Sequence, residues 1–380
     1  GHIAIGGNAL VTQNFASVNN EFEANISIGN KSSHNNTTGN MNVVIGTAAK
    51  YSDDTGNQTT AIGHQAMYSQ NMASSTTTGN VGVGHKVGYY NVTGTGNTWL
   101  GYQAGAGASG QSNSSNVGIG YLALSSVTTG GSNVAIGTNA GNSLTSGGSN
   151  ILIGNGVATT LSTGGSNVII GTLAGIAVSE GEKNILIGRD AGKDISTGDS
   201  NVAIGHQALY VENTGTYAVA IGYRSGYKNR LSAQNENVYV GSNAGRENTD
   251  GNDNVYVGYA AGYGLDGEGA ANNVAVGNQS LRYAKGNDNI AIGHDTGRYA
   301  TGSQNTFVGS EAGEGGQTSA PYSSGQYNTA VGYQALTAFT TGNNNVAIGK
   351  GSSPAITTGI GNVSVGAGAN LSSTTGGSNV

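Results

Sequence analysis

Cysteine is absent from the 380 residues, and proline occurs only 2 times. No disulfide and no thiolate metal site can therefore hold this chain together. Charged residues make up 9% of the chain, aromatic residues 6%, and the formal net charge is −6. Because no stripe of lysine and arginine is present to meet phosphates, a nucleic-acid partner is not expected. No apolar run approaches the length of a membrane span, so we expect no membrane insertion in this segment.

Glycine, by contrast, supplies 68 residues. A collagen helix is excluded because the glycines have no G-X-Y period. Disordered chains combine high net charge with few β-branched residues, whereas here valine and isoleucine recur at fixed places. We therefore expect an ordered chain with a narrow structural plan. The sequence begins at GHIAIG and ends at GGSNV, both inside a repeat, so we expect an excerpt of a longer polypeptide, truncated mid-repeat at both ends.

One short motif of the form N-V-A-I-G recurs along the whole chain. Its closing glycine occurs in 21 copies, spaced 17 residues apart without interruption from Gly120 to Gly222. Such an array predicts a single continuous repeat domain over residues 1–380. A 17-residue unit covers roughly 56 Å of extended path, so it must turn, and TTGGSN-like segments supply a turn in each copy. We expect an all-β fold, a parallel β-solenoid or β-roll of about 21 stacked coils, roughly 100 Å long.

The residues one and three positions before the motif glycine are β-branched in almost every copy. Their period of two predicts a short strand with this pair on one face. We expect the pair to point inward and to stack from coil to coil as a core ladder. That predicted core ladder comprises Val134, Ile136, Ile151, Ile153, Val168, Ile170, Ile185, Ile187, Val202 and Ile204.

Asparagine occupies the position four before the glycine in 18 of the 21 copies. Asparagine tolerates left-handed backbone and caps turns with its amide. If successive copies stack at strand spacing, these amides can also hydrogen-bond along the axis. The sequence thus predicts an asparagine ladder through Asn133, Asn150, Asn167, Asn184 and Asn201.

The residue two before the glycine points away from the β-branched pair, and it is never charged in the 21 copies. Strands that read NILIG or NVIIG are apolar on both sides, as buried parallel strands are. Either another part of the same coil or a partner chain therefore covers this second face. We favour a partner chain and expect a parallel homotrimer. The candidate inter-chain face is the most apolar part, Leu152, Ile169 and Leu186.

No residue pattern indicates catalysis, a cofactor or a metal, and we expect none of the three. GAGASG, residues 105–110, matches the dinucleotide signature G-x-G-x-x-G, but the QSNSSN that follows is no helix. His64, His85, His206 and His294 all follow a motif glycine directly. Many other residue types occupy that position in other copies, which favours a variable surface site over a metal site.

Insertions lengthen several units and predict surface loops, which in repeat proteins often form the binding face. The longest is GEGGQTSAPYSSGQY before Gly332. We favour neutral decoration. If the loop binds a cell-surface glycan or a protein receptor, Tyr322 and Tyr327 are the candidate contact residues, and Tyr263 is another in a second insertion.

The unit N-V-A-I-G-x-x-A-G resembles the head repeats of trimeric autotransporter adhesins, whose pattern is close to S-V-A-I-G-x-x-A-x-A. The stretch NTAVGYQAL, Asn328–Leu336, is similar to repeats in long tail fibres of bacteriophages and related injection machines. The resemblance covers essentially the whole chain and depends on the recurrence of a short motif. In the adhesins such repeats form a left-handed parallel β-roll, three chains side by side on a stalk. The 17-residue unit, asparagine in place of serine, and the lack of a coiled-coil stalk or membrane anchor favour the phage-type fibre.

These features predict a structural function. The leading hypothesis is a shaft segment of an extracellular or virion fibre that mediates attachment to a cell surface, such as a phage tail fibre. The alternative is a bacterial trimeric adhesin whose repeats bind matrix or glycan directly. The expected location is extracellular, on a virion tail fibre or a bacterial cell surface.

Overall fold

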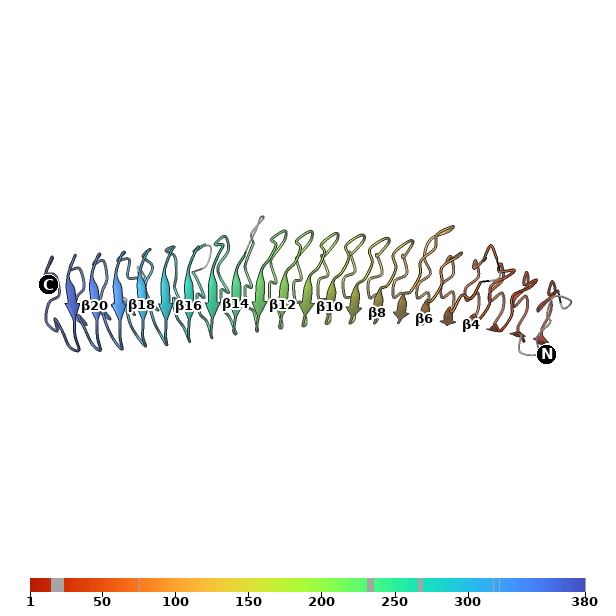
Figure 1. Ribbon diagram of the computed structural model, residues 1–380, viewed down its shortest axis with the longest axis horizontal. Coiled ribbons are helices and arrows are strands. Elements are labelled where there is room, and N and C mark those ends of the chain that lie inside the picture. Colours follow the sequence, from red (N-terminus) through yellow and green to blue (C-terminus); the bar gives the residue numbers. More distant parts are fainter. Residues whose placement is uncertain are drawn as a thin grey trace. The chain divides into compact units, whose positions relative to one another are not determined.

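The computed structural model describes residues 1–14, 24–74, 76–230, 236–265, 269–316, 318–320 and 322–379. The chain divides into two compact units, Gly1–Leu186 and Ile187–Val380, and the division falls inside β11 (Ile185–Ile187). Each unit is a parallel β-solenoid in which every coil contributes one strand of three residues (Figure 1). The all-β solenoid with a 17-residue repeat is therefore confirmed within each unit.

The strands all begin three residues before a motif glycine and end at the residue before it. The first unit contains β1 (Ile3–Ile5), β2 (Ile26–Ile28), β3 (Val43–Ile45), β4 (Thr60–Ile62), β5 (Val81–Val83), β6 (Thr98–Leu100), β7 (Val117–Ile119), β8 (Val134–Ile136), β9 (Ile151–Ile153) and β10 (Val168–Ile170). The second contains β12 (Val202–Ile204), β13 (Val219–Ile221), β14 (Val238–Val240), β15 (Val255–Val257), β16 (Val274–Val276), β17 (Ile290–Ile292), β18 (Thr306–Val308), β19 (Thr329–Val331), β20 (Val346–Ile348) and β21 (Val363–Val365).

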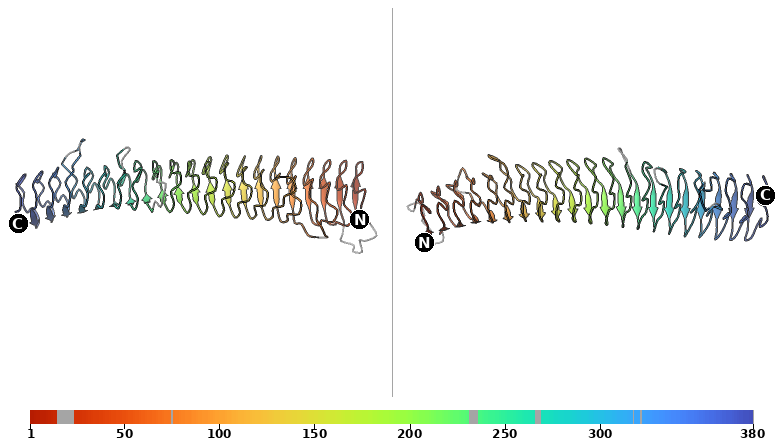
Figure 2. Two further views of the ribbon diagram at one scale, coloured as in Figure 1. Left: turned by 90° about the horizontal axis from the view of Figure 1, so that it is seen from above. Right: turned by 180° about the vertical axis from the view of Figure 1, so that it is seen from behind.

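Successive strands pair in parallel, so equivalent residues of neighbouring coils lie side by side (Figure 2). In β8 and β9, Ala135 pairs with Leu152 and Ile136 with Ile153. The same register holds between β18 and β19, where Val308 pairs with Val331 across the longest insertion. Insertions are therefore accommodated outside the strands, and each position of the repeat forms a column along its unit.

The motif glycine ends each strand with a corner that no other residue can make. All 21 of these glycines have φ between 123° and 145°, a region that side chains rarely adopt. A Cβ placed on Gly137 would also overlap the carbonyl oxygen of Gly154 in the next coil. Both the backbone angle and the close approach of successive coils therefore require glycine.

The predicted inward direction of the β-branched pair is wrong. The central strand residue points into the coil instead: Ala135, Leu152 and Ile169 are fully buried. The flanking residues are only half-buried or exposed, with Ile151 39% and Ile185 37% exposed. A period of two establishes which residues share a face, but not which face is inward. The correction applies to the whole predicted core ladder: Val134, Ile136, Ile151, Ile153, Val168, Ile170, Ile185, Ile187, Val202 and Ile204.

The candidate inter-chain face is corrected for the same reason. Leu152, Ile169 and Leu186 are fully buried within the single chain, so no partner is needed to cover them. The other apolar groups of the coil interior come from the turn after the glycine, such as Ala174, and from the far side of the coil, such as Leu161. The open alternative, that another part of the same coil covers this face, is the one observed.

In several coils the interior volume is divided between the strand centre and the residue four after the motif glycine. Three coils have alanine at the centre and glycine at the fourth position, Gly141, Gly226 and Gly297, and there side chains of the neighbouring coils fill the space. Where the centre is a ring, as in Phe307, the fourth residue is glycine, and a Cβ on Gly313 would overlap that ring. Where the centre is Ala330, the fourth residue is the fully buried Leu336. Other coils show the same exchange and follow one of these two patterns. A ring at the centre occurs with glycine at the fourth position in Trp99 and Gly105, Tyr239 and Gly245, and Tyr256 and Gly262. Alanine at the centre occurs with leucine at the fourth position in Ala203 and Leu209, and in Ala275 and Leu281.

This exchange can be tested with a double-mutant cycle at Phe307 and Gly313. We expect Phe307→Ala to cost about 3–5 kcal/mol because it leaves a cavity. Gly313→Leu should cost about 1–3 kcal/mol because the leucine overpacks the coil. The double variant should cost less than the sum, since Leu336 shows that leucine fits this left-handed position, with φ of 53°. Free energies of unfolding in denaturant measure all three; additivity within ~0.5 kcal/mol would contradict the exchange.

Candidate functional site

The asparagine column joins successive coils and closes each coil internally. The side-chain Oδ1 of Asn133 accepts the backbone N–H of Asn150 and also its Nδ2, both at 3.0 Å. The same Nδ2 of Asn150 donates to the carbonyl of Gly164 on the far side of the coil at 3.0 Å. Because these amides are buried and satisfied, they act in structure and offer nothing to a ligand. The bonds between side-chain amides recur at Asn167 and Asn184, and the bond across the coil recurs at Asn167 and Asn201.

An ion pair lies fully buried in the coil that follows β3. The Nζ of Lys50 lies 3.0 Å from Oδ2 of Asp53, and both side chains are inaccessible to solvent. Asp53 also accepts the N–H of Gly56 at 3.0 Å, the N–H of Met72 at 3.2 Å and Nε2 of Gln70 at 2.7 Å. Burial lowers the pKa of Lys50 although Asp53 opposes this. Burial alone would raise the pKa of Asp53, but Lys50 and the other donors hold it below its usual value.

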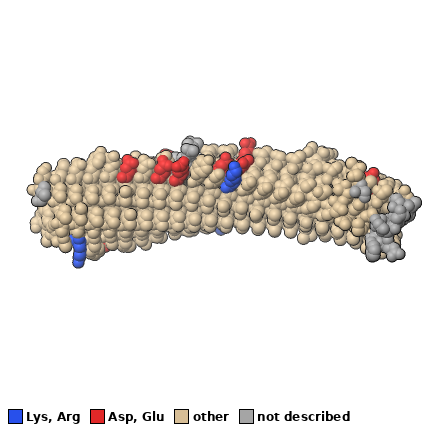
Figure 3. All heavy atoms as spheres, viewed as in Figure 1, with Lys and Arg blue, Asp and Glu red and all other residues tan. Residues whose placement is uncertain are grey.

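The residues one and three before each motif glycine form a continuous outer strand face along each unit. All are valine, isoleucine, leucine or threonine, and none is buried. Ile290 and Ile292 of β17 are 41% and 42% exposed. Few charged side chains appear on the face of the molecule seen in Figure 3. Monomeric proteins seldom expose an apolar stripe of this length, so this face is the candidate interaction surface.

Aromatic and cationic side chains form further columns on the surface. After the motif glycine, His64, His85, Tyr102 and Tyr121 stack on one another at 5.0–5.2 Å between ring centroids. In the second unit Arg246 donates to the hydroxyl of Tyr263 at 2.6 Å. The sequence places the histidines at one position of the repeat, but it shows no stacking by itself. The rings stack because consecutive coils in register carry a ring at that position.

The tyrosines predicted to contact a ligand lie in different columns. Tyr322 stacks on Tyr283, with ring centroids 4.6 Å apart. Tyr263 lies between the guanidinium groups of Arg246 and Arg282, at 5.5 and 5.8 Å from its centroid. Those ring faces are therefore engaged by neighbours within the chain.

Tyr327 is 53% exposed and lies five residues before Gly332, in the column that holds serine in other coils. Its backbone N–H donates to the carbonyl of Ser303 at 3.3 Å. Tyr327 thus follows the repeat itself and is no part of the column that holds Tyr283 and Tyr322. The structure therefore gives the two predicted tyrosines no common binding surface.

The remaining motifs have structural explanations. In GAGASG, a Cβ on Gly105 would overlap the indole of Trp99, so this glycine is required by packing. His206 lies 4.0 Å from a carboxylate oxygen of Asp190, and His294 lies 3.5 Å from one of Asp295. Within the described residues, no cluster of three or more histidine, aspartate and glutamate side chains is arranged to hold a metal ion.

No protein family, no curated protein and no solved structure matches the chain. Among the described residues there is no helix of the length and apolarity that crossing a membrane requires. The geometry of the site is therefore the basis for any statement about function.

The buried ion pair gives a prediction about stability and pH. We expect Lys50→Met to cost about 3 kcal/mol at pH 7, because it leaves the Asp53 carboxylate buried without its ammonium partner. Burial then raises the pKa of Asp53 above its unfolded value, so the folded state gains a proton as the pH falls. The deficit relative to wild type should therefore be smaller at pH 4 than at pH 7. Denaturant unfolding at both pH values measures this.

The matched control is Lys50→Met combined with Asp53→Asn. Methionine and asparagine both occur naturally at these repeat positions in other coils. Met67 is the equivalent of residue 50, and Asn91 is the equivalent of residue 53. The Oδ1 of Asn91 accepts the N–H of Gly94 at 3.1 Å. The double variant should be less destabilised than Lys50→Met at pH 7, since no unpaired charge is buried. A deficit of Lys50→Met that does not change with pH would contradict the assignment.

Proposed function

We propose that the chain is a shaft segment of an extracellular or virion fibre that mediates attachment to a cell surface, as in a phage tail fibre. We further propose that three parallel copies associate through the outer strand face. One observation carries this proposal. The interior of each coil is filled by buried side chains of the same chain, whereas its outer strand face is uncharged and exposed. The repeat's resemblance to fibre and adhesin repeats supports the same function.

The sealed interior suits a load-bearing element. Each coil is bonded to the next through its strand, its asparagine column and its turns, as in the N–H of Gly137 donating to the carbonyl of Ile119 at 2.8 Å. Stability in such an array is a sum over coils and their interfaces, so length can be set by the number of units. Ten coils at ~4.8 Å each extend roughly 50 Å.

The outer strand face is large enough to hold copies together. A three-residue strand is roughly 10 Å long and coils rise ~4.8 Å, so each coil presents about 50 Å² of flat apolar surface. About ten coils in one unit then offer roughly 500 Å² per copy, which a threefold assembly divides between two neighbours. With the coils of the other unit, each pair of copies would bury roughly 1,000 Å² in total, about the least that a biological interface buries. Association would remove from water a stripe that no described residue of a single copy covers.

Parallel threefold association fits the two rows of this face. The first residues of the strands in one copy can contact the last residues of the strands in the next copy. A threefold axis repeats this contact until the third copy meets the first. In a parallel, in-register arrangement each coil meets its own equivalent. The four threonines of the face, Thr60, Thr98, Thr306 and Thr329, then lie at common levels.

A second function, direct binding of matrix or glycan by the repeats, is favoured by exposed tyrosines after the motif glycines. Tyr121 is 50% and Tyr259 52% exposed. The two functions differ in what residues 1–380 do alone. A shaft should not adhere to cells or matrix as residues 1–380 alone, whereas an adhesin built from these repeats should adhere.

Association is tested by Ile290→Glu combined with Ile292→Glu. In sedimentation equilibrium we expect wild type at three times the 37.7 kDa chain mass and the variant at one chain mass. The physical reason is that three copies would bring six carboxylates together at one level of a dry interface. Circular dichroism should show that the variant keeps its β-structure, since both positions are exposed in the single chain.

Thr129→Glu combined with Ser146→Glu is the matched control, because it adds the same charge at exposed positions outside the strands. This control should remain trimeric. The assembly would be contradicted if the wild type were a monomer at micromolar concentration. It would also be contradicted if the two double substitutions changed the oligomeric state equally. Electron cryomicroscopy of the wild type should show a threefold particle with the strands facing the axis.

A further inference from the structure

A column of stacked rings runs along the first unit at the position five after the motif glycine. His34 stacks on Tyr51 at 4.9 Å, Tyr51 on Tyr68 at 5.1 Å, and Tyr68 on Tyr89 at 5.1 Å between ring centroids. The planes of the last two rings differ by only 7°. Each inner tyrosine thus has both faces covered by rings of the neighbouring coils.

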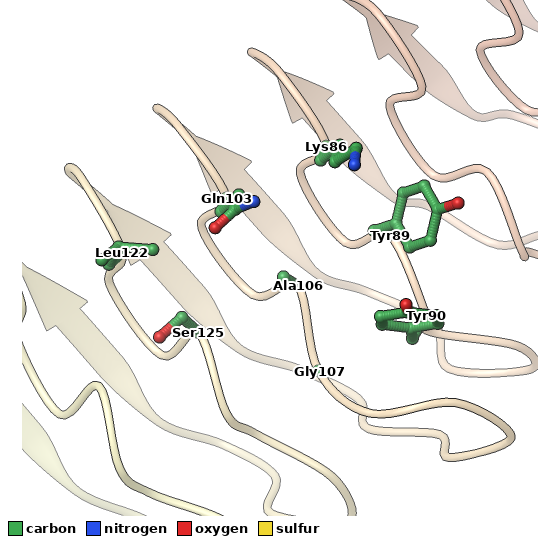
Figure 4. Close-up of a pocket in the computed structure, with 8 residues that line it drawn as sticks. All are labelled: Lys86, Tyr89, Tyr90, Gln103, Ala106, Gly107, Leu122 and Ser125. Carbon is green, nitrogen blue, oxygen red and sulfur yellow. The ribbon is translucent and has the colours of Figure 1, made fainter.

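The column ends at Tyr89 because the next two coils carry Ala106 and Ser125 at this position. The coils remain in register there, since the N–H of Tyr90 donates to the carbonyl of Ala106 at 2.9 Å. Small side chains where a ring would continue the stack leave a pocket of about 330 Å³. Figure 4 shows the two tyrosines at one end of this hollow, Ser125 at the other, and Ala106 between them.

The lining combines one aromatic surface with separate polar groups. The ring of Tyr90 stands at 83° to that of Tyr89, with centroids 4.6 Å apart, and forms a corner of the pocket. The Nζ of Lys86 lies 5.3 Å from the centroid of Tyr89. The amide of Gln103 and the hydroxyl of Ser125 complete the polar lining. Within the described part of the chain no carboxylate forms an ion pair with Lys86.

We propose that this pocket binds a single pyranose ring, and that it prefers a sugar acid to the neutral sugar. A pyranose has an apolar C–H face that can lie on the ring at the end of the stack. Its hydroxyl groups match the amide of Gln103 and the hydroxyl of Tyr90. They can also donate to Oγ of Ser125, whose own proton goes to the carbonyl of Asn142 at 3.3 Å. A carboxylate on the sugar supplies the anion that Lys86 otherwise lacks. The pocket volume lies within the range of small-molecule sites.

Other ligand classes fit this lining less well. A quaternary ammonium ion would suit the two rings but would be repelled by the ammonium of Lys86. A nucleic acid requires several cations along its backbone, and the pocket offers one. Burial, together with Tyr68 and Tyr90, raises the pKa of Tyr89, so its phenol stays neutral at physiological pH. The site lies within one unit and needs no second copy, so it is independent of the proposed shaft function.

The test uses the full chain with two probes, methyl β-D-glucuronide and methyl β-D-glucoside, in saturation-transfer difference NMR. For ligands of this size we expect wild-type dissociation constants of ~1 mM, with the glucuronide bound several-fold more tightly. Lys86→Gln should remove that preference and leave glucoside binding unchanged. Equal affinity of wild type for the two probes would overturn the preference for an acid.

The decisive variant is Ala106→Tyr, which extends the stack into the pocket. It should lower affinity for both probes at least tenfold without lowering the melting temperature, because the new ring stacks as its neighbours do. Tyr227→Ala is the matched control, since it removes a ring that stacks on Tyr210 at 5.0 Å in the second unit, and it should bind as wild type does. Full binding by Ala106→Tyr, an equal loss in Tyr227→Ala, or no binding of either probe by wild type would each overturn the proposal.

A sugar acid can be a free monosaccharide or the end of a glycan. Both carry the same chemistry, and a disaccharide with glucuronic acid at its non-reducing end distinguishes them. Affinity equal to that of the methyl glycoside supports a glycan end. Loss of affinity for the disaccharide, with the methyl glycoside still bound, supports the free sugar.

Discussion

The close approach of successive motif glycines is the constraint on which the rest of the structure depends. Their φ of 123–145° ends every strand after three residues, and the space above each one except the last, Gly366, is filled by the carbonyl of the next. Because this corner is the same in every coil, the strands pair in register even where insertions separate them, as between β18 and β19. Equivalent side chains then meet equivalent side chains.

That register turns each position of the repeat into a column, and the chemistry of a column decides what it contributes. In one column the asparagine side chains hydrogen-bond to one another, and in others the aromatic rings stack. Cations one coil apart would repel at ~5 Å. Tyr263 separates Arg246 from Arg282, whereas Arg282 and Arg298 stand in adjacent coils and Arg298 lies 3.4 Å from a carboxylate oxygen of Asp295. Arg246 lies 3.3 Å from Glu247 as well. Where a column changes from large to small residues, as from Tyr89 to Ala106, the surface is hollowed.

The sequence predicted the solenoid, the coil length and the asparagine column because each depends on spacing alone. It could not orient the strand, because Val134 and Ile136 on one face and Leu152 on the other face are apolar alike. The information was present in a different comparison: Phe307 occurs with Gly313 and Ala330 with Leu336, which identifies the strand centre as the inward position. The sequence does not predict the pocket beside Tyr89, because the pocket arises where small residues, Ala106 and Ser125, follow tyrosines at one position of the repeat.

Trp99 has a consequence for how such a gene can change. Its indole reaches into three successive coils: a Cβ on Gly88 would lie 2.9 Å from it, one on Gly118 would lie 2.7 Å away, and one on Gly105 would overlap it. Tandem arrays lose and gain units by unequal recombination between their copies. A crossover that separated this tryptophan from its three glycines would encode a chain with a steric clash or a void. We therefore expect selection to keep the units around Trp99 together, although the DNA that encodes them is repetitive.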